Sequence, residues 1–166
     1  MMVGRIAITY GGLVLAAAVG LSFVHPWGDV RNVNAQGELF GGSQMPSSVR
    51  QVLEQKCADC HSNRTHWPVY SRLAPGTWLM EHDVNEGRQA LNFSRWQQMR
   101  DDERIDALSR IAAEVRSEEM PPTAYTMMHP TRRISDEEKQ EVALWARAER
   151  RRLRTDAETN KEMSGQ

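Results

Sequence analysis

Apolar residues in this chain recur at the three- and four-residue spacing of helices, and no stretch alternates between apolar and polar as a half-buried strand does. The pattern predicts helices that run from position 47 or 48 into position 57, over 77–89, from 101 onward and from 136 onward. Ser47 or Ser48 is placed to cap the first of these helices, and Ser94 is placed to cap a short turn. At the start of the last helix, Ser135 and Glu138 form a capping box. The sequence therefore predicts an all-α fold.

Each predicted helix has an apolar face that we expect to point inward. The expected inward residues are Val49, Val52 and Leu53; Trp78, Leu79 and Val84; Ile105, Leu108, Ile111, Ala112 and Val115; and Val142, Trp145, Ala146 and Leu153.

An uncharged apolar run covers residues 6–24, which is close to the ~20 residues that a membrane-spanning helix needs. Arg5 precedes the run and predicts that the N-terminus lies in the cytoplasm. The rival interpretation is a cleaved signal peptide, but the small-residue pattern Val33-Asn34-Ala35 lies far beyond the apolar end. We expect an uncleaved signal anchor over residues 1–27, in the inner membrane, with the rest of the chain in the periplasm.

The remaining chain divides by composition. Residues 28–46 contain several Gly and Asn and predict a linker, residues 47–154 form one small domain, and residues 155–166 form a polar tail. The formal net charge is −1, which gives no basic field for nucleic acid, so no nucleic-acid partner is expected.

The sequence Cys-Ala-Asp-Cys-His at positions 57–61 is the pattern of covalent haem attachment, and it contains both cysteines of the chain. Two thiols at this spacing can each add to a haem vinyl group, and the adjacent His61 then reaches the iron as its proximal ligand. A thioredoxin-like dithiol is an alternative, but strand–helix alternation is missing around it. Half a zinc site is another, but a second ligand pair at the right spacing is missing. We expect one covalently bound haem c.

The second axial iron ligand has several candidates, which are Met80, His82, Met99, Met120, Met127, Met128, His129 and His66. Met120 is favoured because it precedes Pro121 and Pro122, which cannot continue a helix and restrict the residue before them to extended conformations. Its thioether would then project from a stiff loop and is a suitable soft ligand for haem iron. The cluster of Met127, Met128 and His129 remains the main alternative. Met80 and Met99 are expected to fill the core.

Beyond the motif, the chain from about residue 49 to 149 resembles a family of small bacterial haem-binding domains with a single C-x-x-C-H sequence. The matching residues are 57–65, Trp67-Pro68, Tyr70-Ser71, Ala74-Pro75, Trp78, Val84, Gly87-Arg88, Leu91-Asn92-Phe93-Ser94, Trp96, Glu119-Met120-Pro121-Pro122, Tyr125, His129-Pro130 and Trp145. Val69 stands where another tryptophan is expected.

The resemblance has implications for the fold and for the surroundings of the haem. A helix before the motif and a C-terminal helix are the arrangement of class I cytochromes c, which implies that the Trp145 face packs against the helix of Val49, Val52 and Leu53. Trp67, Tyr70 and Trp78 are expected to line the haem or its propionate edge. Arg72 and Arg88 are candidates to pair with the propionates, and ordinary surface positions are equally compatible with their sequence.

These features predict a membrane-anchored periplasmic monohaem c-type cytochrome that transfers electrons through a His/Met-ligated haem to redox partner proteins. We expect an electron carrier rather than an enzyme, because two axial ligands leave no open position for a substrate. The alternative is a haem-based sensor or enzyme with an open or labile distal position. Peroxidases of the c type generally carry two haems, which argues against that class here.

Overall fold

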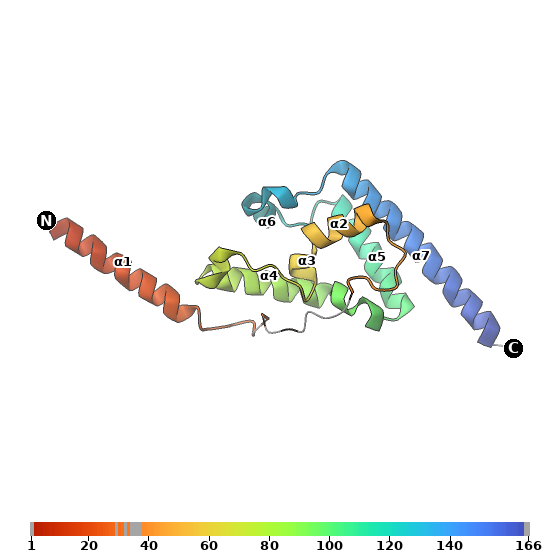
Figure 1. The fold of residues 1–166 in the computed structure, drawn as a ribbon, viewed down its shortest axis with the longest axis horizontal. Coiled ribbons are helices and arrows are strands. Elements are labelled where there is room, and N and C mark those ends of the chain that lie inside the picture. The colour runs from red at the N-terminus through yellow and green to blue at the C-terminus, as the bar shows by residue number, and fades with distance from the viewer. Residues whose placement is uncertain (1, 29, 32, 34–37, 165–166) are drawn as a thin grey trace.

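The computed structural model describes residues 2–28, 30–31, 33 and 38–164. Its longer helices are α1 (Met2–Leu21), α2 (Ser47–Lys56), α4 (Gly76–Ala90), α5 (Asp101–Arg116) and α7 (Asp136–Ser164), as Figure 1 shows. The shorter elements are α3 (Ala58–His61), α6 (Thr123–Met128) and the 3₁₀ turns η1 (Val69–Arg72), η2 (Phe93–Gln98) and η3 (Pro130–Arg132). The described part of the chain contains no strand, so the prediction of an all-α fold is confirmed.

The core lies where α2, α5 and α7 meet. Val49, Val52 and Leu53 of α2 belong to the same buried cluster as Trp145 of α7. The contact between these two helices, implied by the resemblance to class I cytochromes c, is therefore confirmed. Burial of each such side chain stabilises the fold by about 1.5–3 kcal/mol, so this contact holds the haem-motif end of α2 in place.

Two residues of the segment that was expected to be a linker, Leu39 and Phe40, belong to this core. Leu39 and Phe40 are buried, with 3% and 2% of their surface exposed. The Phe40 ring lies 4.3 Å from the Phe93 ring and 4.9 Å from the Trp96 ring, and it meets Trp145 edge-on at 5.6 Å. These contacts join the segment before α2 to η2 and α7.

The helix starts agree only in part with the sequence. At α7 the capping box is confirmed: the Ser135 hydroxyl accepts from the Glu138 amide at 3.2 Å, and the Glu138 carboxylate accepts from the Ser135 amide at 2.7 Å. At α2 the expected serine cap was wrong, because Pro46 occupies the cap position and makes no side-chain bond. At η2 the cap is Asn92, whose side chain accepts from the Ser94 amide, so Ser94 was also the wrong residue.

Helix α4 buries only part of the face that was expected, because Val84 is buried as predicted but Trp78 and Leu79 are not. Its buried residues are Thr77, Met80, Glu81, Val84 and Gly87, whereas Leu79 is 46% exposed and Trp78 is half-buried. The hydrophobic pattern failed here because the carboxylate of Glu81 is buried by ion pairs with residues far away in the sequence.

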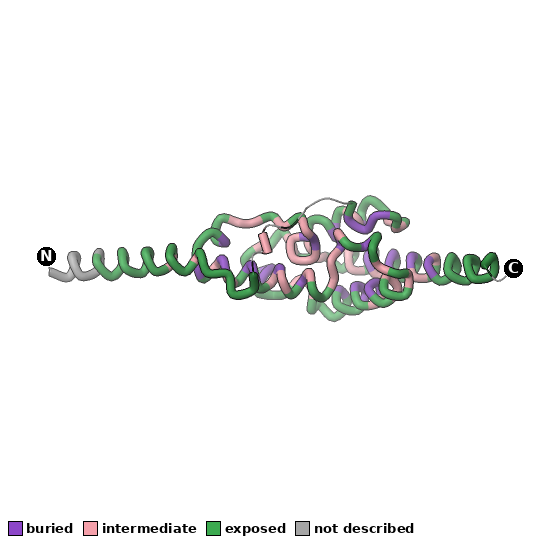
Figure 2. The backbone as a smooth tube through the Cα atoms, turned by 90° about the horizontal axis from the view of Figure 1, so that it is seen from below, coloured by how far each residue is buried: buried purple, intermediate pink, exposed green. Residues whose placement is uncertain are grey.

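The first helix, α1, ends at Leu21 and projects away from the rest of the molecule (Figure 1). Among the helices that the structure describes, none is both long enough and apolar enough to cross a bilayer. At the other end, α7 continues beyond the buried Leu153 to Ser164 as an exposed helix, and buried residues gather between the two ends (Figure 2).

Candidate functional site

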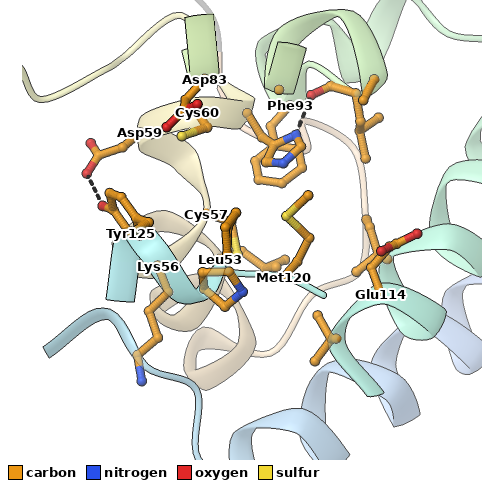
Figure 3. Close-up of a pocket in the computed structure, with 18 of the residues that line it drawn as sticks. Leu53, Lys56, Cys57, Asp59, Cys60, Asp83, Phe93, Glu114, Met120 and Tyr125 are labelled. Atoms are coloured by element: carbon orange, nitrogen blue, oxygen red, sulfur yellow. Dashed lines mark hydrogen bonds between the residues drawn. The ribbon is translucent and has the colours of Figure 1, made fainter. Parts of the chain in front are cut away.

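A cavity of about 420 Å³ lies between α2, α3, α4, α5 and the segment from 120 to 125, as Figure 3 shows. This volume is within the range of about 300–1,000 Å³ typical of ligand sites. The lining residues are Leu53, Lys56, Cys57, Asp59, Cys60, His61, Asp83, Glu86, Gly87, Ala90, Leu91, Phe93, Arg110, Ile111, Glu114, Val115, Met120, Pro121, Pro122 and Tyr125. Both cysteines, His61 and Met120 are thus brought to one cavity.

Cys57 and Cys60 lie at the junction of α2 and α3, and their sulfurs are not joined by a disulfide. Burial raises the pKa of Cys57 to about 12, and burial with the negative charge of Asp83 raises the pKa of Cys60 to about 12. Reactive dithiols have lowered pKa values, so this environment argues against the dithiol alternative. Within the described residues, no three His, Cys, Asp or Glu side chains gather as metal ligands.

The His61 ring is held in a fixed orientation. Its Nδ1 donates to the Leu91 carbonyl oxygen at 3.0 Å, and the ring stacks on Phe93 with centroids 5.5 Å apart. Burial lowers the pKa of His61, more than its backbone hydrogen bonds raise it, so the neutral imidazole is favoured. A neutral histidine whose Nδ1–H binds a backbone carbonyl presents Nε2 as a metal ligand. The arrangement therefore leaves Nε2 as the ring nitrogen that is available to a ligand in the cavity.

Gly87 allows α4 to lie directly against the haem-attachment motif. A Cβ atom at this position would lie 2.7 Å from the Cys60 carbonyl oxygen, which is closer than real side chains come. The same helix ends at Ala90, and the next residue, Leu91, is the partner of His61. Helix α4 thus supports both Cys60 and His61.

Met120 lies in the loop between α5 and α6, as expected from its neighbouring prolines. Its amide donates to the Glu114 carbonyl oxygen at 3.3 Å, and its side chain points into the cavity between Cys57 and Phe93 (Figure 3). Among the candidate distal ligands, Met120 lines this cavity, and the others lie outside the lining that the structure describes.

The other candidate ligands have different surroundings. Met80 is buried, and its sulfur accepts from the Tyr70 hydroxyl at 3.3 Å. Met127 and Met128 are 69% and 48% exposed. Met99 packs against the core, and His66 is exposed. His82 forms a hydrogen bond with Asp83, and His129 forms one with Tyr70.

The aromatic residues expected around the haem lie elsewhere. Trp67 is covered by the Arg31 guanidinium at 4.1 Å, and the Trp78 indole donates to the Val24 carbonyl oxygen at 2.9 Å. Tyr70 forms a hydrogen bond of 2.9 Å with His129. Trp67 and Trp78 thus bind the segment that follows α1, which sequence spacing could not indicate.

The two arginines suggested for the propionates also lie outside the cavity lining. Arg88 donates to the carbonyl oxygens of Ser62 and Val30 and to the Thr65 hydroxyl, so its donors bind the chain itself. Arg72 is exposed on η1. The cations of the lining are instead Lys56, which pairs with Glu138 at 2.5 Å, and the exposed Arg110 of α5.

One pair of cavity residues had no assigned role in the sequence analysis. The Tyr125 hydroxyl donates to the Asp59 carboxylate at 3.1 Å (Figure 3), and the Arg132 guanidinium lies 3.5 Å from the same oxygen. Burial and the charge of Asp59 raise the pKa of Tyr125 above its usual value. Tyr125 belongs to the family-like residues, but only the structure shows its partner.

Comparison with known proteins gives two matches. A sequence profile described as a haem-binding domain matches residues 16–148. The cytochrome c peroxidase Ccp of Escherichia coli strain K12 is 28% identical over 154 residues, which are 90% of this chain and 33% of that protein. The chain thus spans about a third of the length of this curated relative. No solved structure matches.

Proposed function

This chain belongs to the haem-binding domain family, and we propose that it holds one haem c through Cys57 and Cys60 and works as an electron carrier. The observation that carries the proposal is the meeting of both thiols, His61 and Met120 in one cavity. Two thiols that can form thioether links to the haem vinyl groups, with an imidazole and a methionine sulfur as candidate iron ligands, are the groups that a small cytochrome c uses.

The residues that line the cavity fit a covalently attached haem. Apolar side chains such as Leu53, Ile111 and Val115 supply walls for a macrocycle, and the buried thiols stand at one side of the cavity. His61 has Nδ1 engaged, which leaves Nε2 for the iron. When bound, the haem supplies an iron that gains and loses one electron.

The protein's own contribution is to hold the ligands and exclude water. Phe93 and Leu91 fix the plane of the His61 ring, and the loop between α5 and α6 places Met120 in the same cavity. With His61 and Met120 both bound to the iron, a haem held here would have no open position for a substrate. This arrangement supports electron transfer over catalysis.

Arg110 is our candidate partner for the haem propionates, in place of Arg72 and Arg88. It lines the cavity from α5, whereas the thiols stand on the α2–α3 side. Haem carries its vinyl and propionate groups on opposite edges, so attachment at the thiols directs the carboxylates toward the far wall. Lys56 is less suitable because it is already bound to Glu138 and to the Arg133 carbonyl oxygen.

A peroxidase-type reaction is the second candidate function, suggested by the similarity to a cytochrome c peroxidase. Cleavage of a peroxide requires an open iron position and a nearby proton donor. Tyr125, hydrogen-bonded to Asp59 in the cavity wall, is the candidate donor. This function requires that Met120 leave the iron, so the carbon monoxide spectrum of the reduced protein separates the two proposals. Ready binding favours the enzyme or sensor, and resistance favours the carrier.

We also propose that the chain is attached to the inner membrane with the haem domain in the periplasm, where it meets redox partner proteins. The support is the uncharged run over residues 6–24 and the position of Arg5 before it. The test is cell fractionation with haem staining. The haem protein should stay with membranes after an alkaline carbonate wash, and its release into the periplasmic fraction would refute the attachment.

A further inference from the structure

The segment that follows α1 is bound along the outer side of α4 and η1. We call residues 22–28, 30 and 31 the strap. The hydroxyl of Ser22 accepts from the Ala74 amide at 2.8 Å, and the carbonyl oxygens of the strap accept from Trp78 and Arg88 at 2.9 and 2.6 Å. These contacts join both ends of the strap to the domain.

The centre of this contact is a buried carboxylate. Glu81 has no exposed side-chain surface. Nδ1 of His25 lies 3.0 and 3.1 Å from its two oxygens, and Nε of Arg31 lies 3.2 Å from one of them. Both partners come from the strap. A buried charge is tolerated in a protein only when it is paired and hydrogen-bonded, so the burial of Glu81 depends on the strap.

Arg31 makes further contacts that hold it in place. Its guanidinium donates to the Ser71 carbonyl oxygen and covers the Trp67 ring at 4.1 Å. The planar guanidinium of arginine can stack on an aromatic ring and donate hydrogen bonds at the same time, which the ammonium group of lysine cannot do. Trp67, which the resemblance placed at the haem, therefore serves this contact with the strap instead.

Helix α4 links the strap to the cavity. Its outer side carries Glu81, while Gly87 touches Cys60 and the residue after the helix, Leu91, binds His61. The strap thus holds the helix that supports the attachment motif. The family match begins at residue 16, so it takes in the strap as well.

We propose that the strap is a permanent part of the haem domain, retained in the mature protein and locked by the contacts of Glu81 with His25 and Arg31. Cleavage in the region of Val33-Asn34-Ala35 would remove both partners of Glu81. Glu81 would then lose both side chains that bind its carboxylate, and Trp78 and Arg88 would lose the strap carbonyl oxygens that accept from them. Processing at Val33-Asn34-Ala35 is therefore incompatible with the contacts that the strap makes in the folded domain.

Trypsin cleavage after Arg31 in the full-length haem-loaded protein tests the lock. The intact strap should protect this bond, because the Arg31 side chain is engaged. Glu81→Gln should speed cleavage at Arg31 at least about tenfold, since loss of one partner of a buried pair costs well over the energy of a factor of ten. His25→Ala leaves Arg31 paired and should give a smaller increase, which provides a readout if Glu81→Gln fails to fold.

Glu141→Gln is the matched control, because Glu141 is exposed and lies on α7. It should leave the cleavage rate unchanged. Equal rates in the wild-type protein and in both strap variants would overturn the proposal. So would a mature protein, purified from the membrane or periplasm and sequenced, that starts after residue 31. Neither outcome depends on whether the haem carries electrons or reacts with peroxide.

Discussion

Nδ1 of His61 donates a 3.0 Å hydrogen bond to the carbonyl oxygen of Leu91, thirty positions further along the chain. This bond fixes which ring nitrogen is free and ties the haem-attachment motif to the end of α4. The orientation of the proposed iron ligand is thus set by a helix that the motif itself does not include.

Substitution of Gly87 by alanine should damage the site through this helix. A Cβ there would come within 2.7 Å of the Cys60 carbonyl oxygen and push α4 away. We expect a loss of about 1–3 kcal/mol in the free energy of unfolding and a lower yield of covalent haem. Urea unfolding of the haem protein measures the first effect.

A loss of stability would identify the close contact, because a change from glycine to alanine within a helix otherwise stabilises the protein by about 1 kcal/mol. Gln89→Ala, at an exposed position of the same helix, serves as the control and should be silent. A stabilised Gly87→Ala protein with normal haem content would contradict the close contact.

Replacement of Met120 by alanine should open the iron. The oxidised protein should lose its weak far-red sulfur-to-iron band, and the reduced protein should bind carbon monoxide. The reduction potential should fall, since a thioether ligand raises it. Met127→Ala, on an exposed side chain of the next helix, should change none of these spectra.

Persistence of the band in Met120→Ala would move the assignment to another residue, with Met127, Met128 and His129 next. Ready carbon monoxide binding by the wild-type protein would instead favour the sensor or enzyme.

Arg110→Gln should lower the reduction potential, because removal of a positive charge near the iron stabilises the more positive oxidised form. It should also shift the pH dependence that propionate ionisation gives the potential to higher pH, because a carboxylate without its cation has a higher pKa. Arg116→Gln, on the same helix and outside the cavity lining, is the charge-matched control. Equal potentials in the two variants would show that Arg110 does not pair with the propionates.

Alkaline conditions should destabilise the protein through Tyr125. Its folded-state pKa is raised by burial and by Asp59, so the unfolded chain ionises first as the pH passes its ordinary value of about 10. The stability is complete below that value and is lost as the pH rises toward the folded-state pKa. Urea unfolding at pH 8 and pH 10.5 should show the loss in the wild-type protein.

Tyr125→Phe should remove this part of the pH dependence and cost stability at pH 8, since the Asp59 carboxylate loses a donor. Tyr10→Phe, on an exposed residue of α1, should behave as the wild type. Identical pH dependence in Tyr125→Phe and the wild-type protein would argue against the Asp59 contact.

Local signals in the sequence were sufficient for part of the structure. The motif at 57–61 and the prolines after Met120 constrain the chain within a few residues, and the structure brings both to one cavity. The start of α7 was predicted because a capping box is complete within Ser135 and Glu138.

Long-range partners could not be read in the same way. The burial of Glu81 depends on His25 and Arg31, which precede it by about fifty positions. Without knowledge of that pairing, a charged residue on α4 reads as exposed and Leu79 reads as buried, which is the reverse of the structure. Arg88 was a candidate partner for the propionates because the sequence does not reveal that its guanidinium binds the backbone carbonyl oxygens of Ser62 and Val30.

Covalent attachment of a single haem through Cys57 and Cys60 is the central claim, and acid–acetone extraction of the denatured protein tests it most directly. The account predicts that the haem stays with the polypeptide, gives a haem c pyridine spectrum at one haem per chain, and is lost in the Cys57→Ser/Cys60→Ser double variant. Haem that passes into the acetone phase from the wild-type protein would contradict it.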